Sequence, residues 1–173
     1  LLPQLKLKLK LKCKLNLTVK EIKMSNTIDM SALDVDMNSV EDLKGFELPP
    51  EGSYTCTLSL APKVINGETR VEWKYDVVEP IELNDPDAVV PAGATFNQLM
   101  GLKPIKTKDG KDFDPKSVFK VKCTILSEAL GVPNGVRELV EAAQNIQVTC
   151  FLKHKLTNGK LYAEVTDAGF AVA

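Results

Sequence analysis

Residues 52–83, GSYTCTLSLAPKVINGETRVEWKYDVVEPIEL, contain two runs of alternating apolar and polar residues joined by Asn66 and Gly67. An Asn-Gly pair favours a type I′ hairpin turn, which needs positive φ at both central residues. The apolar residues share one face of each predicted strand: Tyr54, Cys56, Leu58 and Leu60 in the first, and Val71, Trp73, Tyr75 and Val77 in the second. The stretch therefore predicts an antiparallel hairpin with one buried face and one face in water.

A second hairpin is predicted near the end of the chain, over residues 146–165, with its turn at Asn158 and Gly159. Between the two hairpins, residues 89–102 are expected to form a third strand that leads into a turn. Residues 96–102 could instead form one helical turn. The pattern thus predicts five strands in all.

Three further segments separate the predicted third strand from the second hairpin. Residues 104–115 are polar, charged and rich in turn residues, which predicts an exposed loop. Residues 117–130 fit either a helix face or an alternating strand, and Gly131 ends the segment. Residues 136–145 carry an apolar stripe at helical spacing and therefore predict a helix.

This order of three strands, a helical segment and two strands predicts a mainly β fold. It fits a five-stranded OB-fold-like barrel, in which a helical segment lies between strands 3 and 4. A jelly-roll β-sandwich and an α+β sheet with one covering helix are the alternatives. Since OB-folds bind oligonucleotides or oligosaccharides, we expect surface residues of this chain to bind such a polymer.

Charge is distributed unevenly along the chain. Residues 1–23 carry seven lysines and one glutamate, whereas residues 24–51 carry seven acidic residues and one lysine. Residues 52–173, the predicted OB-fold-like domain, hold 14 basic and 15 acidic residues. A basic footprint over a whole domain is the usual sign of nucleic-acid binding, so any such site here must be a local patch.

Leucine and lysine alternate from Leu5 to Leu17, and the first 23 residues fit no secretory or transit signal. Residues 20–24 can be back-translated into a purine-rich ribosome-binding sequence before a start codon. We therefore expect residues 1–23 to be a non-native translated leader and Met24 to be the start; an extended arm is the alternative. Residues 24–51 are expected to form an acidic, flexible N-terminal arm that docks weakly or recruits partners.

The sequence argues against membrane spanning and against catalysis. No apolar run is long enough to span a bilayer. The single histidine, His154, has no neighbour in sequence that would orient it, and the sequence contains no zinc, P-loop or nucleophile-elbow motif. The four cysteines are far apart and are expected to be thiols in a reducing compartment: Cys13, Cys56, Cys123 and Cys150. We expect a protein that is not an enzyme and that uses no cofactor or metal.

Aromatic and cationic residues share the predicted outward phase of the second hairpin. Phe151 and Tyr162 lie in the phase that should face water, interleaved with lysines. Binders of single strands combine such cations with aromatic rings on which bases stack. The predicted nucleic-acid-binding set is Arg70, Lys74, Lys106, Lys108, Phe151, Lys153, Lys155, Lys160 and Tyr162. The alternative is that a bulge reverses the phase, or that the arm or helix covers the two aromatic rings.

Short motifs from Pro50 to Val172 resemble a phage-encoded family of OB-fold proteins similar to single-stranded-DNA-binding proteins. The motifs are a Pro-x-Gly-x-Tyr strand start at residues 50–54, a strand like residues 71–78, an Ala-Leu-Gly turn at residues 129–131, a loose match at residues 145–148 and a closing hairpin that contains glycine. A basic groove typical of such binders is missing from this near-neutral domain, although five lysines around the predicted loop could supply one: Lys103, Lys106, Lys108, Lys111 and Lys116.

The resemblance implies non-sequence-specific binding of single-stranded DNA in phage replication or recombination, in the cytoplasm of an infected bacterial host. The expected partners are single-stranded DNA and, through the acidic arm, phage replication or recombination proteins; a homo-oligomer is also possible. The alternative function is a phage structural protein, such as a capsid decoration or tail component, with an interlocking N-terminal arm. A third possibility is an adaptor that binds host proteins.

Overall fold

The computed structural model describes residues 47–173. The predicted leader, residues 1–23, and most of the acidic arm, residues 24–51, lie outside the described residues. None of the helices within residues 47–173 is long and apolar enough to cross a membrane.

The first predicted hairpin is confirmed. Strands β1 (Gly52–Ile65) and β2 (Glu68–Leu83) pair antiparallel along their whole length. Asn66 and Gly67 connect them with φ angles of 51° and 76°. Both values lie in the left-handed region that a type I′ turn requires, which explains why the Asn-Gly pair identified this turn.

The second hairpin is also confirmed. Strands β6 (Ile146–Thr157) and β7 (Lys160–Val165) pair antiparallel around Asn158 and Gly159, whose φ angles are 51° and 75°. A short strand, β8 (Ala171–Val172), follows β7 and pairs with the first half of β6.

The segment between the hairpins differs in detail from the prediction. The third strand, β3 (Thr95–Gly101), is shorter than predicted and pairs with β2. The predicted exposed loop contains two short strands, β4 (Ile105–Lys106) and β5 (Asp112–Phe113), which form a separate two-stranded sheet.

The ambiguous segment is helical. A 3₁₀ helix, η3 (Pro115–Phe119), leads into α2 (Lys120–Leu130), which ends at Gly131 with φ of 65°. A second helix, α3 (Val136–Ala142), follows where an apolar stripe predicts one. The helical segment therefore lies between the third long strand and β6, as predicted.

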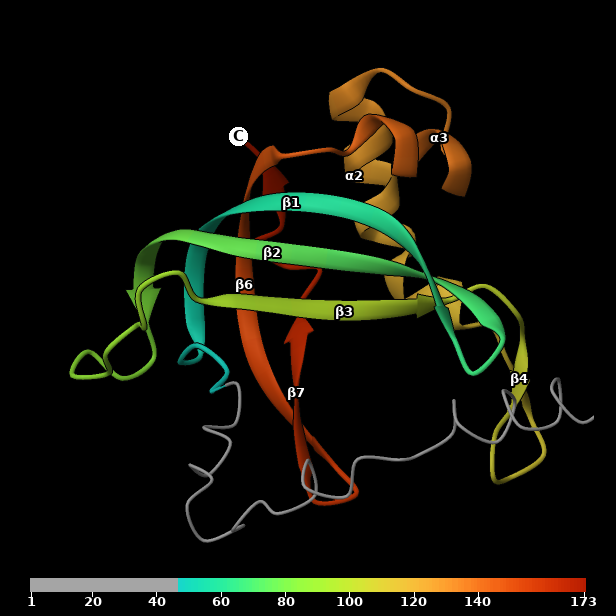
Figure 1. The fold of residues 1–173 in the computed structure, drawn as a ribbon, viewed down its shortest axis with the longest axis horizontal. Helices are drawn as coiled ribbons and strands as arrows, with labels where there is room; N and C mark the ends of the chain where they lie inside the picture. Colours follow the sequence, from blue (N-terminus) through green and yellow to red (C-terminus); the bar gives the residue numbers. More distant parts are fainter. Residues whose placement is uncertain (1–46) are drawn as a thin grey trace, which may run out of the picture. The chain divides into compact units, whose positions relative to one another are not determined.

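The main sheet is antiparallel and has six strands, in the order β3-β2-β1-β6-β7, with β8 beside β6. Figure 1 shows β1, β2 and β3 running across the view and β6 and β7 running up and down, so the sheet bends sharply between its two halves. The first and last strands of this order, β3 and β7, approach each other to within 8 Å between Cα atoms. They form no hydrogen-bonded ladder, so the sheet is not closed and the predicted barrel is not confirmed.

Strand β1 forms the bend of the sheet. Its first seven residues, 52–58, pair with β2 on one side and with β6 on the other. Register shifts against β2 occur between Ser53 and Tyr54 and between Thr55 and Cys56. Such bulges increase the local twist of a strand and allow a sheet to curve.

The core lies on the concave side of the sheet. It contains the predicted apolar phase of the first hairpin, and residues from the helices complete it: Leu126 from α2, with Leu139 and Ala143 from α3 and its end. Trp73 is fully buried, and its ring lies 5.2 Å from that of Phe119. The helices thus cover the end of the sheet at which β6 begins (Figure 1).

Candidate nucleic-acid interface

The open seam between β3 and β7 forms a groove of about 510 Å³. One wall comes from β3, the other from β7, and η3 closes one side. The residues that line the groove are Arg70, Asn97, Gln98, Leu99, Phe113, Pro115, Val118, Phe119, Lys155, Tyr162, Ala163 and Glu164. We refer to this space as the seam groove. Its volume falls in the range of about 300–1,000 Å³ that is typical of ligand pockets.

Three of the predicted binding residues meet at the seam groove. Tyr162 on β7 lies directly opposite Lys155 on β6, so the two side chains share a face of the hairpin. Tyr162 is 50 % exposed. Arg70 comes from β2, where it pairs with Gly101 of β3, and it also lines the groove. Sheet register therefore brings an aromatic ring and two cations from distant segments to one site.

One acidic residue, Glu164, lies among the lysines of the second hairpin, directly opposite Lys153. Within residues 47–173, Lys153, Lys155 and Lys160 form no ion pair. By contrast, Lys74 on β2 lies 3.1 Å from Asp76. Arg70 has a looser carboxylate neighbour, Glu68, at 3.7 Å. The local excess of positive charge therefore lies on the outer face of the β6–β7 hairpin.

Phe151 lies apart from the seam groove. Its ring is half-buried, and its carbonyl oxygen accepts a hydrogen bond from the backbone N–H of Thr166 at 3.1 Å. A Cβ built on Gly169 would lie 3.7 Å from the Cβ of Phe151, so the connection between β7 and β8 passes beside it. The Nζ atom of Lys153 lies 6.0 Å from the ring centroid, at the limit of a cation–π contact.

The other predicted cations lie around the edges of the site. Lys106 on β4 and Lys108 in the following turn are exposed and lie on the separate β4–β5 hairpin. Lys74 lines a different hollow, together with Leu48 and Phe96. The structure thus gathers Arg70, Lys155 and Tyr162 and does not bring these lysines into the seam groove.

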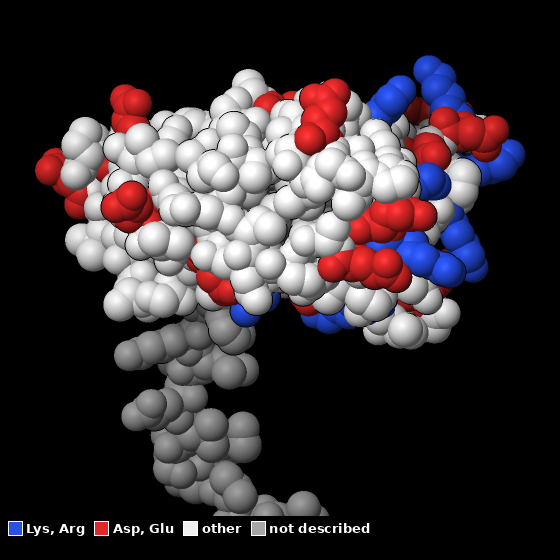
Figure 2. Space-filling view, turned by 90° about the horizontal axis from the view of Figure 1, so that it is seen from above, with Lys and Arg blue, Asp and Glu red and all other residues white. Residues whose placement is uncertain are grey.

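Charge on the helical side of the fold is mixed. Figure 2 shows this side, with lysine and arginine side chains gathered at the end where Figure 1 shows β4. Aspartate and glutamate side chains are interleaved with them, and few charged side chains cover the middle. This face therefore offers no uniform basic surface, in keeping with the neutral composition of the domain.

Most of the apolar and amide residues of the groove were not predicted as site residues, among them Gln98, Leu99, Phe113 and Val118. Leu99 lies in the outward phase of β3, where a water-facing leucine is a weak signal. Phe113 is the one aromatic residue in a charged, turn-rich segment, and that contrast was the signal available in the sequence. Their partners across the groove are far away in sequence, so only the tertiary structure reveals the site.

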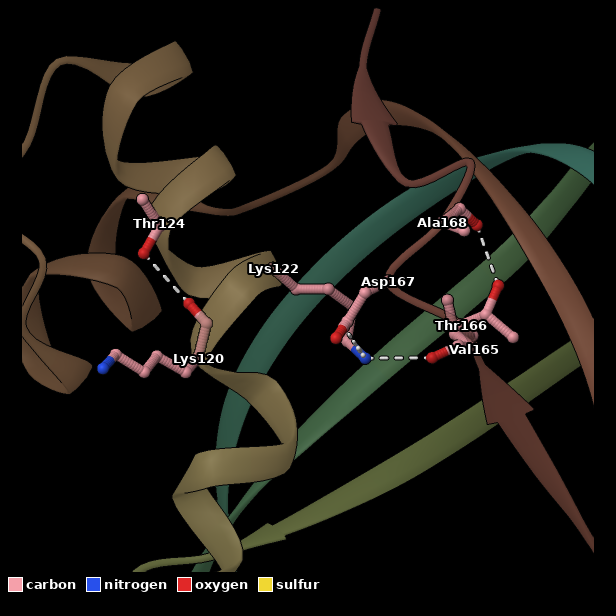
Figure 3. A network of polar contacts seen from close by, with 7 residues as sticks. All are labelled: Lys120, Lys122, Thr124, Val165, Thr166, Asp167 and Ala168. Atoms are coloured by element: carbon pink, nitrogen blue, oxygen red, sulfur yellow. Dashed lines mark hydrogen bonds and ion pairs between the residues drawn. The ribbon is translucent and has the colours of Figure 1, made fainter.

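A buried lysine fastens the far end of β7 to α2 (Figure 3). The Nζ atom of Lys122 donates hydrogen bonds to the carbonyl oxygen of Val165 at 2.9 Å and to the Asp167 carboxylate at 3.4 Å. It also lies 5.0 Å from the ring centroid of Phe119, which lines the seam groove. Burial lowers the pKa of Lys122, and the Asp167 charge opposes that shift. This network holds one end of the groove wall in place.

The remaining polar groups offer little chemistry. Within residues 47–173, no three His, Cys, Asp or Glu side chains gather as a metal site requires. His154 is half-buried, and its Nε2 atom lies 2.7 Å from the Pro49 carbonyl oxygen. Cys56 and Cys150 are buried with their sulfur atoms 3.8 Å apart, and the hydrogen-bonding contact with Cys150, together with burial, raises the pKa of the Cys56 thiol. A raised pKa disfavours the thiolate that nucleophilic chemistry needs.

Comparison with known proteins adds no relative from which a role could be transferred. Neither a protein-family model nor a curated protein sequence gives a significant match to this chain. The case for a function therefore depends on the geometry of the seam groove and the adjoining hairpin.

Proposed function

We propose that this protein is a non-enzymatic binder of single-stranded DNA built on an OB-fold-like barrel whose seam between β3 and β7 is open. The strand order β3-β2-β1-β6-β7, with the helices between β3 and β6, supports this assignment because it is the order expected of such a barrel. The two end strands of the sheet, β3 and β7, lie close to each other, and this proximity also supports the assignment.

The observation that carries the functional proposal is the position of Tyr162. Its half-exposed ring lies beside Lys155 on the outer face of the hairpin and lines the same groove as Arg70. A base stacks on the tyrosine while the cations bind the phosphates on either side of it. Stacking of this kind contributes about 1–3 kcal/mol per base and tolerates any sequence, which suits binding without sequence specificity.

Lys153 and Lys160 extend the cationic track along the same hairpin. Their ammonium groups have no carboxylate within ion-pair distance among the described residues, so phosphate oxygens can take that place. Binding releases the counterions of the strand, so affinity falls steeply as salt rises. By its resemblance to the phage family, we assign this activity to phage replication or recombination in the cytoplasm of the bacterial host.

The test is fluorescence anisotropy of a labelled oligothymidylate titrated with the full chain at low and moderate salt. We expect binding at low salt that weakens as salt rises, and Lys155→Ala should weaken it further. Lys120→Ala removes the same charge from α2, outside the seam groove, and serves as the matched control. Folded protein that fails to bind at low salt would exclude the proposed function.

One observation favours a structural role as the second candidate. Leu156 and Leu161 form a cross-strand pair near the tip of the β6–β7 hairpin and are 69 % and 59 % exposed. Exposed apolar pairs of this kind occur where another subunit packs. In a capsid decoration or tail protein we expect symmetric oligomers that dissociate on Leu156→Lys, with no salt-dependent affinity for DNA. Sedimentation velocity of the wild-type protein and Leu156→Lys, combined with the anisotropy titration, decides between these roles.

A further inference from the structure

A second, smaller hollow adjoins the seam groove along the edge of β3. It has a volume of about 210 Å³ and is lined by Glu68, Thr69, Arg70, Leu99, Gly101, Leu102, Lys103, Ile105, Phe113 and Pro115. Four residues line both spaces: Arg70, Leu99, Phe113 and Pro115. The two hollows are therefore neighbours that share one wall.

The shared wall and its surroundings are apolar but exposed. Leu99 and Phe113 are 39 % and 36 % exposed, and Val118 in the larger hollow is 46 % exposed. Apolar side chains that remain open to water inside a concavity favour a flat, apolar ligand surface such as the face of a base. The hollows thus offer faces for stacking on both sides of the shared wall.

Polar groups in the larger hollow suit the edge of a base. Gln98 lines this hollow, and its Oε1 atom is buried without a hydrogen-bond partner. A buried amide oxygen without a hydrogen-bond partner costs free energy. If the side-chain amide of Gln98 rotates toward the hollow, a ligand N–H can donate to this oxygen and remove that cost. The neighbouring Asn97 donates its amide to Glu72 at 2.9 Å, so of the two amides that line this hollow Gln98 is the one whose oxygen is buried without a partner among the described residues.

Arg70 is the cation that both hollows share. Its side chain is 37 % exposed, and its carboxylate neighbour Glu68 is 3.7 Å away, a loose contact that a phosphate can replace. A guanidinium binds two phosphate oxygens at once, which gives it an advantage over an ammonium group at this position. A cation between two apolar hollows matches the alternation of phosphate and base along a strand.

We propose that the two hollows receive two consecutive bases of a single strand, with the phosphate between them bound by Arg70. This inference rests on the proposed function and specifies which part of the strand enters the seam. The larger hollow takes one base against Tyr162 and Gln98, and the smaller hollow takes its neighbour against Leu99 and Phe113. A polymer is favoured over a small molecule because the two hollows adjoin each other and Arg70 lies at the wall that they share.

The test fills the hollows without changing charge. Leu99→Trp obstructs both hollows and Val118→Trp obstructs only the larger one. Val89→Trp, at a position that is 83 % exposed and lines neither hollow, is the matched control. Binding is measured with oligothymidylate and with an abasic oligomer of equal length and charge. Thermal unfolding followed by circular dichroism confirms that each variant is folded.

We expect Val118→Trp, which obstructs one hollow, to weaken oligothymidylate binding by about 5- to 150-fold, the equivalent of one stacked base, and Leu99→Trp, which obstructs both, to weaken it more. The abasic oligomer should bind Leu99→Trp and the wild-type protein equally, because it places no base in the hollows. Wild-type affinity for oligothymidylate in both folded tryptophan variants overturns the inference but leaves the proposed function standing if Lys155→Ala still weakens binding. Failure of the wild-type protein to bind either oligomer rejects both.

Discussion

The Nζ atom of Lys122 lies 2.9 Å from the carbonyl oxygen of Val165, and the lysine side chain is only 1 % exposed. An ammonium group in such a place needs partners, because an unpaired buried charge is strongly destabilising. Val165 at the end of β7 and Asp167 just beyond it supply them. A single side chain of α2 thus connects the helix to the strand that forms one wall of the seam groove.

Lys122→Met and Lys122→Ala should separate the packing of this side chain from its charge. Methionine keeps the apolar stem, and the released Asp167 is 47 % exposed, so no buried charge is left behind. We therefore expect Lys122→Met to cost about 1–3 kcal/mol at neutral pH, because it removes the charged donor of the Val165 carbonyl oxygen. Lys122→Ala also leaves a cavity and should cost about 2 kcal/mol more. Urea unfolding followed by the fluorescence of Trp73, the single tryptophan, measures both; equal costs would contradict this account.

The lowered pKa of Lys122 predicts how stability depends on alkaline pH. The unfolded chain holds this proton with the ordinary pKa of 10.5, whereas the folded protein releases it at lower pH. Between the two pKa values the unfolded state binds more protons, so the free energy of unfolding rises with pH. The stability of the wild-type protein relative to Lys122→Met should therefore increase up to pH 10.5. Urea titrations of both proteins at several alkaline pH values measure it, and a constant difference would show that the pKa is not lowered.

The sequence predicted the two hairpins because the information for them is local. Each has period-two alternation and an Asn-Gly turn, and the buried face of the first follows directly from Tyr54, Leu58 and Trp73. Lys122 could not be predicted in the same way. Lysine is rarely buried, and its partner Val165 is 43 residues away along the chain. The alternation around Lys122 also resembled a strand, until packing of α2 on the core decided for a helix.

Only part of the candidate site could be predicted for a similar reason. Tyr162 and Lys155 were identified because both fall in the outward phase of one predicted hairpin, and the structure places them opposite each other. Phe113 and Val118 become walls of the seam groove only because β5 and η3 pack beside β3. The predicted barrel is not confirmed, since strand order alone does not reveal whether β3 and β7 form hydrogen bonds with each other.

The hydrogen bond between Glu51 and His154, at the start of the domain, should stabilise the fold less in acid. The Glu51 carboxylate accepts a hydrogen bond from the backbone N–H of His154 at 2.7 Å, and this bond is the main reason that its pKa lies below 4.5. The unfolded chain therefore binds this proton more tightly, so the stabilisation is complete above pH 4.5 and is lost as pH falls through the lowered value. The stability difference between the wild-type protein and Glu51→Gln should be constant near neutral pH and shrink below pH 4.5. Urea unfolding from pH 3 to 7 measures it; a difference that grows in acid would contradict the assignment.

Two lysines with different neighbours should contribute differently to the salt dependence of binding. Lys155 has no acidic neighbour at ion-pair distance within residues 47–173, whereas Lys74 lies 3.1 Å from Asp76. Each phosphate contact contributes about 0.7 to the slope of log K against log salt for a single strand. Lys155→Ala should reduce the slope by about that amount, and Lys74→Ala should leave it unchanged. Anisotropy titrations at four salt concentrations measure both slopes, and equal reductions would place Lys74 in the site as well.

The two aromatic residues of the second hairpin should have separate roles. Tyr162 is half-exposed and lines the seam groove, so Tyr162→Ala should weaken oligothymidylate binding by about 5- to 150-fold with little change in stability. Phe151 is half-buried beside Gly169 and lies outside the groove, so Phe151→Ala should instead lower the free energy of unfolding.

Unfolding and binding must both be measured on each variant, because each residue should affect one measurement and leave the other nearly unchanged. Tyr162→Phe serves as the control for Tyr162, since it keeps the ring and should retain the affinity if stacking is the source of the binding energy. Loss of affinity in Phe151→Ala without loss of stability would move the stacking site from the seam groove to the face of β6 beside Lys153. The cation–π contact of Lys153 with the Phe151 ring would then be part of the DNA site rather than a contact within the folded hairpin.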